Sequence, residues 1–297
     1  MNTAVSLSIV VAVQYAQDNL AEMVERLRPS RHPNVEFLFC HTTADPDTPR
    51  LVSGAENVSV LCGEPGSLIP HLWRDGIRAA RGPLVAVTTA HCLPALDWVE
   101  RLLVADLTGS AGIGGVIEND PASDAKGWAV YLLRYMRYAP PQQAREVAEI
   151  AADNAVYRRQ EIVRHDDLLR KKGFWEPSFH ARFAADHLSL RLDPTLRVVH
   201  RNRYTVGQFM GQRWAHGREF GLARARSADP LRRVLLVAFS PAIPFVYFGK
   251  LCKWILGKKE YRLYFLKAMP WFVLFMLSWN AGEIYGYFLS IVAENNR

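Results

Sequence analysis

The chain has 297 residues and is 49% hydrophobic, which suits one large domain or two smaller ones with a buried core and excludes a disordered protein. The net charge of +7 is uneven, because residues 194–297 hold 16 Lys and Arg against 5 Asp and Glu. A basic last third fits a surface that faces anionic lipid headgroups or phosphates. Nucleic acid is the competing partner, but the sequence has no recognition motif for it, so we expect no nucleic-acid binding.

The cysteines and the N-terminus favour a reduced, cytosolic compartment. The four cysteines are widely spaced and form no Cys-x-x-Cys pair, so the sequence predicts neither a zinc site nor a disulfide framework. The first residues lack a basic segment followed by an apolar run and a cleavage site, so no signal peptide is expected.

Apolar strands alternate with amphipathic helices over the first hundred residues. In chain order, strands are expected at residues 5–13, 35–40, 58–62 and 84–87, and helices at residues 14–28, 68–80 and 96–106. A glycine-opened strand at 112–117 and a last strand at 196–200 follow. The glycines at 112–115 do not open a helix after a strand, which excludes a dinucleotide fingerprint. The alternation predicts an α/β fold with a doubly wound, mostly parallel sheet.

A polar tetrapeptide, Thr88-Thr89-Ala90-His91, comes directly after the apolar strand at 84–87. Open α/β sheets hold their ligands in the crevice beyond the carboxyl ends of the strands. We therefore expect a ligand site at this strand end. A second cluster, rich in aromatic and polar residues, lies at 173–180 and contains Glu176.

The last third predicts an amphipathic helix at 208–226 and two apolar runs, at 234–249 and 268–282. Crossing a bilayer takes about 20 residues, and the first run is shorter and broken by Pro241 and Pro244. Basic clusters precede the first run and separate the two, and both favour the cytoplasmic side. We therefore expect a segment that lies in or dips into the inner leaflet, rather than a two-span hairpin. The alternative is a buried helical pair of a soluble dimer.

Several short motifs, in this order and spacing, resemble family-2 glycosyltransferases of the GT-A fold over residues 5–225. No single motif is specific, and the resemblance rests on their order. The motifs are the strand at 8–13, Asp75-Gly76 through Arg81-Gly82, Gly114-Gly115, Asn154-Ala155-Val156-Tyr157-Arg158-Arg159, Gly173-Phe174-Trp175-Glu176, Leu188-Ser189-Leu190-Arg191-Leu192 and Val198-Val199-His200.

The resemblance implies a GT-A-like domain at residues 1–226 and membrane-associated helices at residues 227–297. It implies an enzyme that moves a sugar from a nucleotide sugar to a lipid-linked or glycan acceptor, with inversion. The enzyme is expected at the cytoplasmic face of the cell membrane. Its expected role is in the synthesis of cell-envelope polysaccharide. The alternative is a catalytically silent domain that binds a nucleotide sugar or a partner enzyme at the membrane.

The chain departs from the family at three acidic positions. The acids that follow the second strand are replaced by His41-Thr42-Thr43, and the metal-binding D-x-D by Thr88-Thr89-Ala90-His91. The usual catalytic acids fall at Ala184-Ala185, next to Asp186. The family's divalent cation, Mg²⁺ or Mn²⁺, therefore lacks its usual ligands, and the sequence leaves open whether one is bound.

Two carboxylates are candidates for the catalytic base. Glu176 lies in an aromatic loop, where partial burial raises the pKa of a carboxyl group towards a useful range. Its structural alternative is capping a turn. Asp186 is the second candidate. Its structural alternative is an exposed residue at the start of a strand. His91 could bind a metal or meet the diphosphate as an imidazolium, or it could be a hydrogen-bonded structural residue.

The remaining candidates are assigned to substrate binding. Arg158 and Arg159 could contact phosphates, since guanidinium geometry suits them, or could be solvated surface residues. Asn154 could orient hydroxyl groups or cap a helix. Arg213 lies in a partial Q-x-x-R-W motif that also fits an interfacial helix. The resemblance also assigns to substrate binding four residues at strand ends and on a helix: Val13, His41, Asp75 and Thr89.

Overall fold

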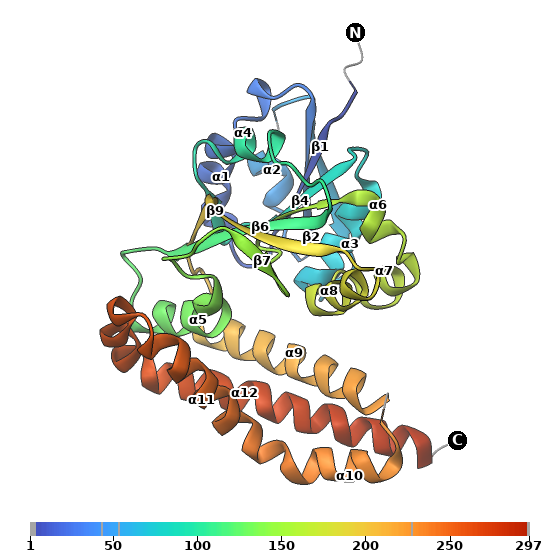
Figure 1. The fold of residues 1–297 in the computed structure, drawn as a ribbon, viewed down its shortest axis with the longest axis vertical. Helices are drawn as coiled ribbons and strands as arrows, with labels where there is room; N and C mark the ends of the chain where they lie inside the picture. Colours follow the sequence, from blue (N-terminus) through green and yellow to red (C-terminus); the bar gives the residue numbers. More distant parts are fainter. Residues whose placement is uncertain (1–3, 43, 53, 227, 296–297) are drawn as a thin grey trace. The chain divides into compact units, whose positions relative to one another are not determined.

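The computed structural model describes residues 4–42, 44–52, 54–226 and 228–295 (Figure 1). The chain divides into two compact units. The first comprises residues 1–120 and 138–203, and the second residues 121–137 and 204–297.

The first unit is built on one mixed sheet with the strand order β3-β2-β1-β4-β8-β6-β9-β5, and β7 pairs with β9. Strands β3, β2, β1 and β4 run parallel, and β6 runs parallel to β9. Strand β8 runs antiparallel to both β4 and β6. The strands are β1 (Leu7–Ala12), β2 (Val35–Thr42), β3 (Val58–Gly63), β4 (Leu84–Thr89), β5 (Cys92–Pro94), β6 (Ser110–Asn119), β7 (Arg145–Val147), β8 (Asn154–Arg158) and β9 (Ser189–His200).

Helices cover the sheet of the first unit. They are α1 (Leu20–Leu27), α2 (Thr48–Val52), α3 (Ile69–Ala79), α4 (Trp98–Leu103), α6 (Arg159–Val163), α7 (Asp166–Lys172) and α8 (Glu176–Ala185). On one face, side chains of α3 and α8 join alternate residues of β1, such as Val10 and Ala12, in one core cluster. The intervening residues Ile9 and Val11 are also fully buried, so both faces of β1 are covered. This is why the strand reads as a continuous apolar run.

The second unit is helical. It contains α5 (Ala125–Tyr135), α9 (Val206–Arg226), α10 (Pro230–Phe239), α11 (Ile243–Leu256) and α12 (Arg262–Asn295). Pro241 lies in the short 3-10 turn between α10 and α11, and Pro244 in the first turn of α11, where proline is tolerated. Among the described residues, one stretch, Leu231–Ile255, is long and apolar enough to cross a membrane, and it spans this break.

Helices α9 and α12 lie side by side (Figure 1). Glycines of each helix lie close to the backbone of the other. A Cβ atom on Gly217 of α9 would lie 2.2 Å from the carbonyl oxygen of Trp279. A Cβ atom on Gly282 of α12 would lie 2.1 Å from the carbonyl oxygen of Trp214. Gly221 and Gly286 make equivalent approaches one helical turn later. The two backbones therefore pack at a distance that only glycine permits.

The architecture agrees with the predicted α/β fold, a mostly parallel sheet followed by apolar helices. The sequence places the domain boundary after Arg226, whereas the compact units of the structure divide the chain after Arg203. The difference arises because α9 packs along α12 and therefore belongs with the C-terminal helices. The aromatic-rich helix α5 also contributes to the helical unit, although it lies between strands of the first unit in the sequence.

Candidate active site

The carboxyl ends of β1, β2 and β4 lie level with one another at one edge of the sheet. In the parallel register, Ala12 of β1 pairs with Cys40 of β2 on one side and with Thr89 of β4 on the other. Val13 continues β1 and donates its backbone N–H to the carbonyl of Cys40 at 2.8 Å. The residues that follow these strands therefore meet at one place, which is where sheets of this type hold ligands.

Asp153 brings a carboxylate to the end of β4. Its carboxylate oxygen Oδ1 accepts a hydrogen bond from Thr89 Oγ1 at 3.1 Å, and its carbonyl accepts one from Thr88 Oγ1 at 2.8 Å. Asp153 is 4% exposed. It arrives here because β8 runs antiparallel to β4, with Asn154 opposite Thr88, so the residue before β8 lies at the carboxyl end of β4. Asp153 is not among the residues that the sequence predicts for the site.

Glu176 lies next to this carboxylate. It is the first residue of α8, it is partly buried, and its Oε1 accepts the backbone N–H of Ala152 at 3.3 Å. Ala152 directly precedes Asp153, so hydrogen bonds and one peptide link connect Glu176 to Thr89. The structure thus brings the first-choice base and the end of β4 together.

Tyr157 confirms that both carboxylates share one neighbourhood. Burial raises the pKa of Tyr157 well above its ordinary value, and the negative charges of Glu176 and Asp153 raise it further. The phenol is fully buried, lies 3.1 Å from Nε2 of His180 and therefore stays neutral.

His91 is held by the backbone. The side chain is 1% exposed, its Nε2 lies 2.8 Å from the carbonyl oxygen of Gln14, and its Nδ1 lies 3.4 Å from that of Arg201. Both ring nitrogens thus face carbonyl oxygens, an arrangement that ties the loop after β1 to the end of β9. This geometry matches the structural alternative for His91 rather than a metal ligand. Within the described parts of the chain, no three His, Cys, Asp or Glu side chains gather as a metal site.

Asn154 is also committed to internal bonds. Its amide nitrogen donates to the carbonyls of Val116 at 2.9 Å and Leu196 at 3.1 Å, and its Oδ1 accepts from Trp98 Nε1 at 2.8 Å. The side chain is fully buried and joins β6, β8, β9 and α4. The expectation that Asn154 orients substrate hydroxyls is therefore corrected to a structural role, since its donors and acceptor already have partners.

Arg158 and Arg159 lie at the opposite edge of the sheet from Thr89. In the antiparallel register, Arg158 pairs with Leu84 at the amino end of β4, about 13 Å from Thr88 at the strand spacing. Its guanidinium donates to the carbonyl of Leu107. These arginines therefore cannot contact phosphates bound at the carboxyl ends of the parallel strands. The reason is that β8 runs antiparallel to β4.

Asp75 and His41 lie at the ends of β2 and β3. His41 is 5% exposed, and its Nδ1 lies 2.8 Å from the carbonyl oxygen of Asp45. Asp75, on α3, has an oxygen 3.3 Å from the position of a Cβ atom on Gly63, the last residue of β3. Burial raises the pKa of the Cys40 thiol, and the Asp75 carboxylate raises it further, which places that negative charge near the end of β2. Asp75 thus offers a carboxylate at this part of the sheet edge.

Asp186 and Arg213 are placed elsewhere. Asp186 follows the last residue of α8, and its Oδ2 lies 3.0 Å from Nε2 of His165. A helix of ten residues is about 15 Å long, so Asp186 and Glu176 lie at opposite ends of α8. Arg213 belongs to α9 of the helical unit, where its guanidinium lies 4.2 Å from the centre of the Trp279 ring.

Comparison with known proteins identifies the fold. No protein-family model matches the chain. No curated protein matches it either. Among solved structures, the mannosyltransferase PcManGT from Pyrobaculum calidifontis, in complex with GDP-Man and Mn²⁺, is 14% identical, with 95% of this chain and 88% of that chain covered at a TM-score of 0.50. The crystal structure of a mycobacterial protein is also 14% identical, with 73% and 74% covered at a TM-score of 0.46.

The likeness to the mannosyltransferase extends over nearly the whole chain, the C-terminal helices included. At 14% identity it concerns the fold and not the chemistry of the site. The chain therefore has a glycosyltransferase-like α/β fold.

Proposed function

We propose that the protein transfers a sugar from a nucleotide sugar to a lipid-linked or other glycan acceptor at a membrane. The observation that carries the proposal is the group formed by Thr89, Asp153 and Glu176 at the carboxyl ends of the parallel strands. A structural neighbour that binds GDP-Man adds support at the level of the fold.

Glu176 is the proposed general base. Sugar transfer with inversion needs a group that takes the proton of the acceptor hydroxyl as the new bond forms. Glu176 is partly exposed, so an acceptor can reach it, and the N–H of Ala152 fixes its orientation. Asp186, the second candidate for this role, lies at the other end of α8 and carries no part of the proposal.

Asp75 is the proposed contact for the nucleoside. The family's acids after the second strand are missing here, but the Asp75 carboxylate lies near the ends of β2 and β3. A carboxylate at that place can accept hydrogen bonds from ribose hydroxyls or from a base. The backbone of Val13 and the ring of His41 lie at the same end of the sheet. Thr89 and Asp153 lie where the proposed site would hold the sugar of the donor.

The side chains at the end of β4 that could serve as metal ligands fit a preformed Mg²⁺ or Mn²⁺ site poorly. Such sites need several oxygen ligands, usually with carboxylates among them. At the end of β4, Asp153 is the carboxylate, the hydroxyls of Thr88 and Thr89 already donate to Asp153, and both nitrogens of His91 face carbonyls. The proposal therefore routes no step through a metal.

A catalytically silent domain that binds a nucleotide sugar is the second candidate. The observation that favours it is the strand end itself, where Thr88 and Thr89 replace the acids of the family and His91 is engaged by the backbone. Such a protein would bind the nucleotide without turning over the sugar donor.

Titration calorimetry of the detergent-solubilised protein with GDP, UDP and dTDP, each with Mn²⁺ and with EDTA, tests the proposal. We expect one nucleotide to bind and its binding to persist in EDTA. The affinity for this nucleotide should fall at least tenfold in Asp75→Asn but not in Asp186→Asn. Binding that requires Mn²⁺ would contradict the metal-free site. Binding without turnover of the matching nucleotide sugar would favour the silent domain, and no binding of any nucleotide would overturn both.

A further inference from the structure

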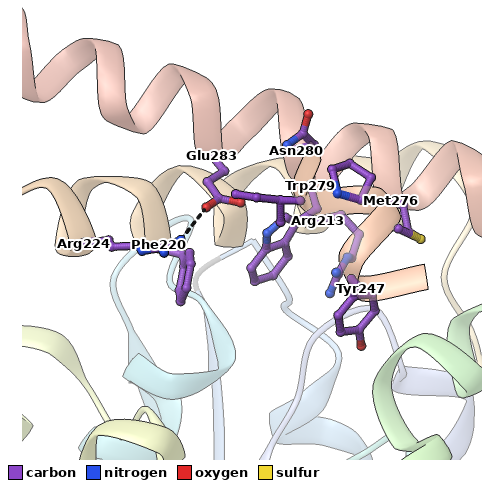
Figure 2. Close-up of a pocket in the computed structure, with 10 residues that line it drawn as sticks. Arg213, Phe220, Arg224, Tyr247, Met276, Trp279, Asn280 and Glu283 are labelled. Carbon is purple, nitrogen blue, oxygen red and sulfur yellow. Dashed lines mark ion pairs between the residues drawn. The ribbon is translucent and has the colours of Figure 1, made fainter. Parts of the chain in front are cut away.

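The helical unit contains a cavity of about 350 Å³ that the proposed sugar transfer does not use (Figure 2). All its lining residues come from α9, α11 and α12. They are Arg213, Phe220, Arg224, Ile243, Pro244, Tyr247, Met276, Trp279, Asn280 and Glu283. Its size lies within the range of small-molecule sites.

Three ionisable side chains give this cavity a net charge of +1 at neutral pH. Arg224 lies 3.6 Å from the Glu283 carboxylate, which is the ion pair drawn in Figure 2. Arg213 stacks over Trp279 and is the second cation. Burial lowers the pKa of Arg213 to about 10, which leaves the guanidinium charged at pH 7. A ligand with one negative charge would balance the cavity.

Two buried polar atoms in the wall still need partners. Among the residues that the structure describes, neither Nε of Arg213 nor Oε2 of Glu283 has a hydrogen-bond partner. Glu283 is completely buried, and its Oε1 is engaged by Tyr287 and Arg224. Leaving buried polar groups unpaired is costly. A fitting ligand therefore brings both an acceptor for the guanidinium and a hydrogen-bond donor for the carboxylate.

Apart from Tyr247 and Asn280, the rest of the wall is apolar, and it continues outward. Ile243 and Arg224 also line an adjoining pocket of about 190 Å³, together with Arg232, Leu235, Leu236 and Phe239. Phe239 is 67% exposed. A ligand that fills both pockets would thus have a polar end between the arginines and an apolar end along α10.

We propose that this cavity binds an anionic glycerophospholipid. Its phosphodiester lies between Arg213 and Arg224, a headgroup hydroxyl donates to Oε2 of Glu283, and an acyl chain follows the apolar wall towards Phe239. A phosphodiester carries the single negative charge that the cavity lacks, and guanidinium groups bind phosphate oxygens well. The proposal does not depend on sugar transfer, because all the residues involved belong to the helical unit.

The test uses the full chain in a non-ionic detergent and measures the binding of dioctanoyl phosphatidylglycerol by titration calorimetry. Dioctanoyl phosphatidylcholine, which is zwitterionic and has no headgroup hydroxyl, and glycerol 3-phosphate, which has no acyl chain, are the reference ligands. We expect phosphatidylglycerol to bind at least tenfold more tightly than either. This comparison needs only the wild-type protein.

The variant Arg213→Met should lower the affinity for phosphatidylglycerol to that for phosphatidylcholine. Arg218→Met is the matched control, because Arg218 lies on the same helix and stacks on a tryptophan, Trp214, outside the cavity. It should keep the preference. Equal binding of the two lipids, or an unchanged preference in Arg213→Met, would overturn the proposal. Equal binding of glycerol 3-phosphate would overturn the assignment to a lipid and leave a free-phosphate site.

Discussion

At the scale of single residues, one helix separates two carboxylates that the sequence leaves as rivals. Glu176 begins α8 beside Asp153, and Asp186 follows its end beside His165. The sequence makes both plausible, Glu176 from its aromatic neighbours and Asp186 from its position next to that of the family's catalytic acids. Only the position of the helix relative to the strand ends distinguishes them.

Glu176→Gln should reduce kcat by roughly 10²- to 10⁴-fold, because it removes the proton acceptor and preserves the shape of the side chain. Nucleotide affinity should stay within about twofold. Asp186→Asn is the matched control and should change kcat by less than about twofold. Transfer of the sugar from the nucleotide sugar selected by calorimetry provides the assay, and equal losses in the two variants would contradict the assignment of the base.

Glu36 is a structural carboxylate whose ionisation stabilises the first unit. Burial opposes its charge, but hydrogen bonds from Ser8 and from the backbone and side chain of Arg81 outweigh burial and lower its pKa below 4.5. The carboxylate therefore contributes stability above about pH 4.5. That contribution is lost as the pH falls through the lowered pKa of the folded state.

Glu36→Gln should reduce the free energy of unfolding at pH 7 by about 1–3 kcal/mol, because it weakens bonds to a 4%-exposed side chain. The difference between variant and wild type should shrink as the pH falls from about 4.5 towards the lowered pKa of the folded state, because the unfolded chain takes up its proton before the native carboxylate does. Urea unfolding monitored by tryptophan fluorescence at several pH values measures both. Exposed Glu56→Gln is the control, and a pH-independent difference for Glu36→Gln would refute this account.

At the scale of elements, the pairing of α9 with α12 depends on glycines at a spacing of four residues on each helix. Gly217 and Gly221 of α9 face the backbone of α12, and Gly282 and Gly286 of α12 face that of α9. A backbone carbonyl cannot rotate away as a flexible side chain can. A methyl group at these positions must therefore push the helices apart.

Gly217→Ala should lower the thermal stability of the helical unit, by roughly 2 kcal/mol or more, because its Cβ would lie 2.2 Å from a carbonyl oxygen. Gly211→Ala on the same helix has no atom within 4 Å of its Cβ and should raise stability by about 0.5–1 kcal/mol through helix propensity. Circular dichroism melts in detergent compare the two. A Gly217→Ala protein as stable as Gly211→Ala would show that the two helices are not in close contact.

At this scale, the direction of β8 determines which of its residues lie at the carboxyl ends of the parallel strands. The segment at 154–159 resembles a family motif, but the sequence shows neither that it forms a strand nor in which direction that strand runs. Because β8 is antiparallel, Asp153 reaches the ligand edge, and Arg158 reaches the opposite one. The sequence therefore predicts substrate binding from this segment, and the direction of β8 places Arg158 away from the carboxyl ends of the parallel strands.

At the scale of the whole molecule, apolar side chains are exposed on α10 and α11. Phe239 is 67% exposed and Phe245 is 78% exposed. Large exposed apolar groups close to basic residues suit a protein that rests on an anionic membrane. Membrane association remains a proposal, which these exposures support, and the cytoplasmic side remains an expectation from the sequence alone.

Replacing Phe239 and Phe245 together by Glu should weaken binding to vesicles that contain phosphatidylglycerol by at least about 100-fold. Each buried phenylalanine is worth roughly 1.5–3 kcal/mol. Flotation of the purified protein with vesicles measures the bound fraction. Val104→Glu, at an equally exposed apolar position of the first unit, is the control and should bind normally. Unchanged flotation of the double variant would exclude these helices as the membrane-facing surface.

The sequence by itself determined the order of strands and helices from β1 to β6 except for the short α2 and β5, the polar end of β4, and the apolar C-terminal helices, because hydrophobic periodicity and turn residues are local properties of the chain. It also selected Glu176 from its aromatic surroundings. Only the tertiary structure decided the direction of β8, the place of Asp153, the internal bonds of Asn154 and His91, and the membership of α9 in the helical unit. These depend on which distant segments become neighbours, and no local pattern carries that information.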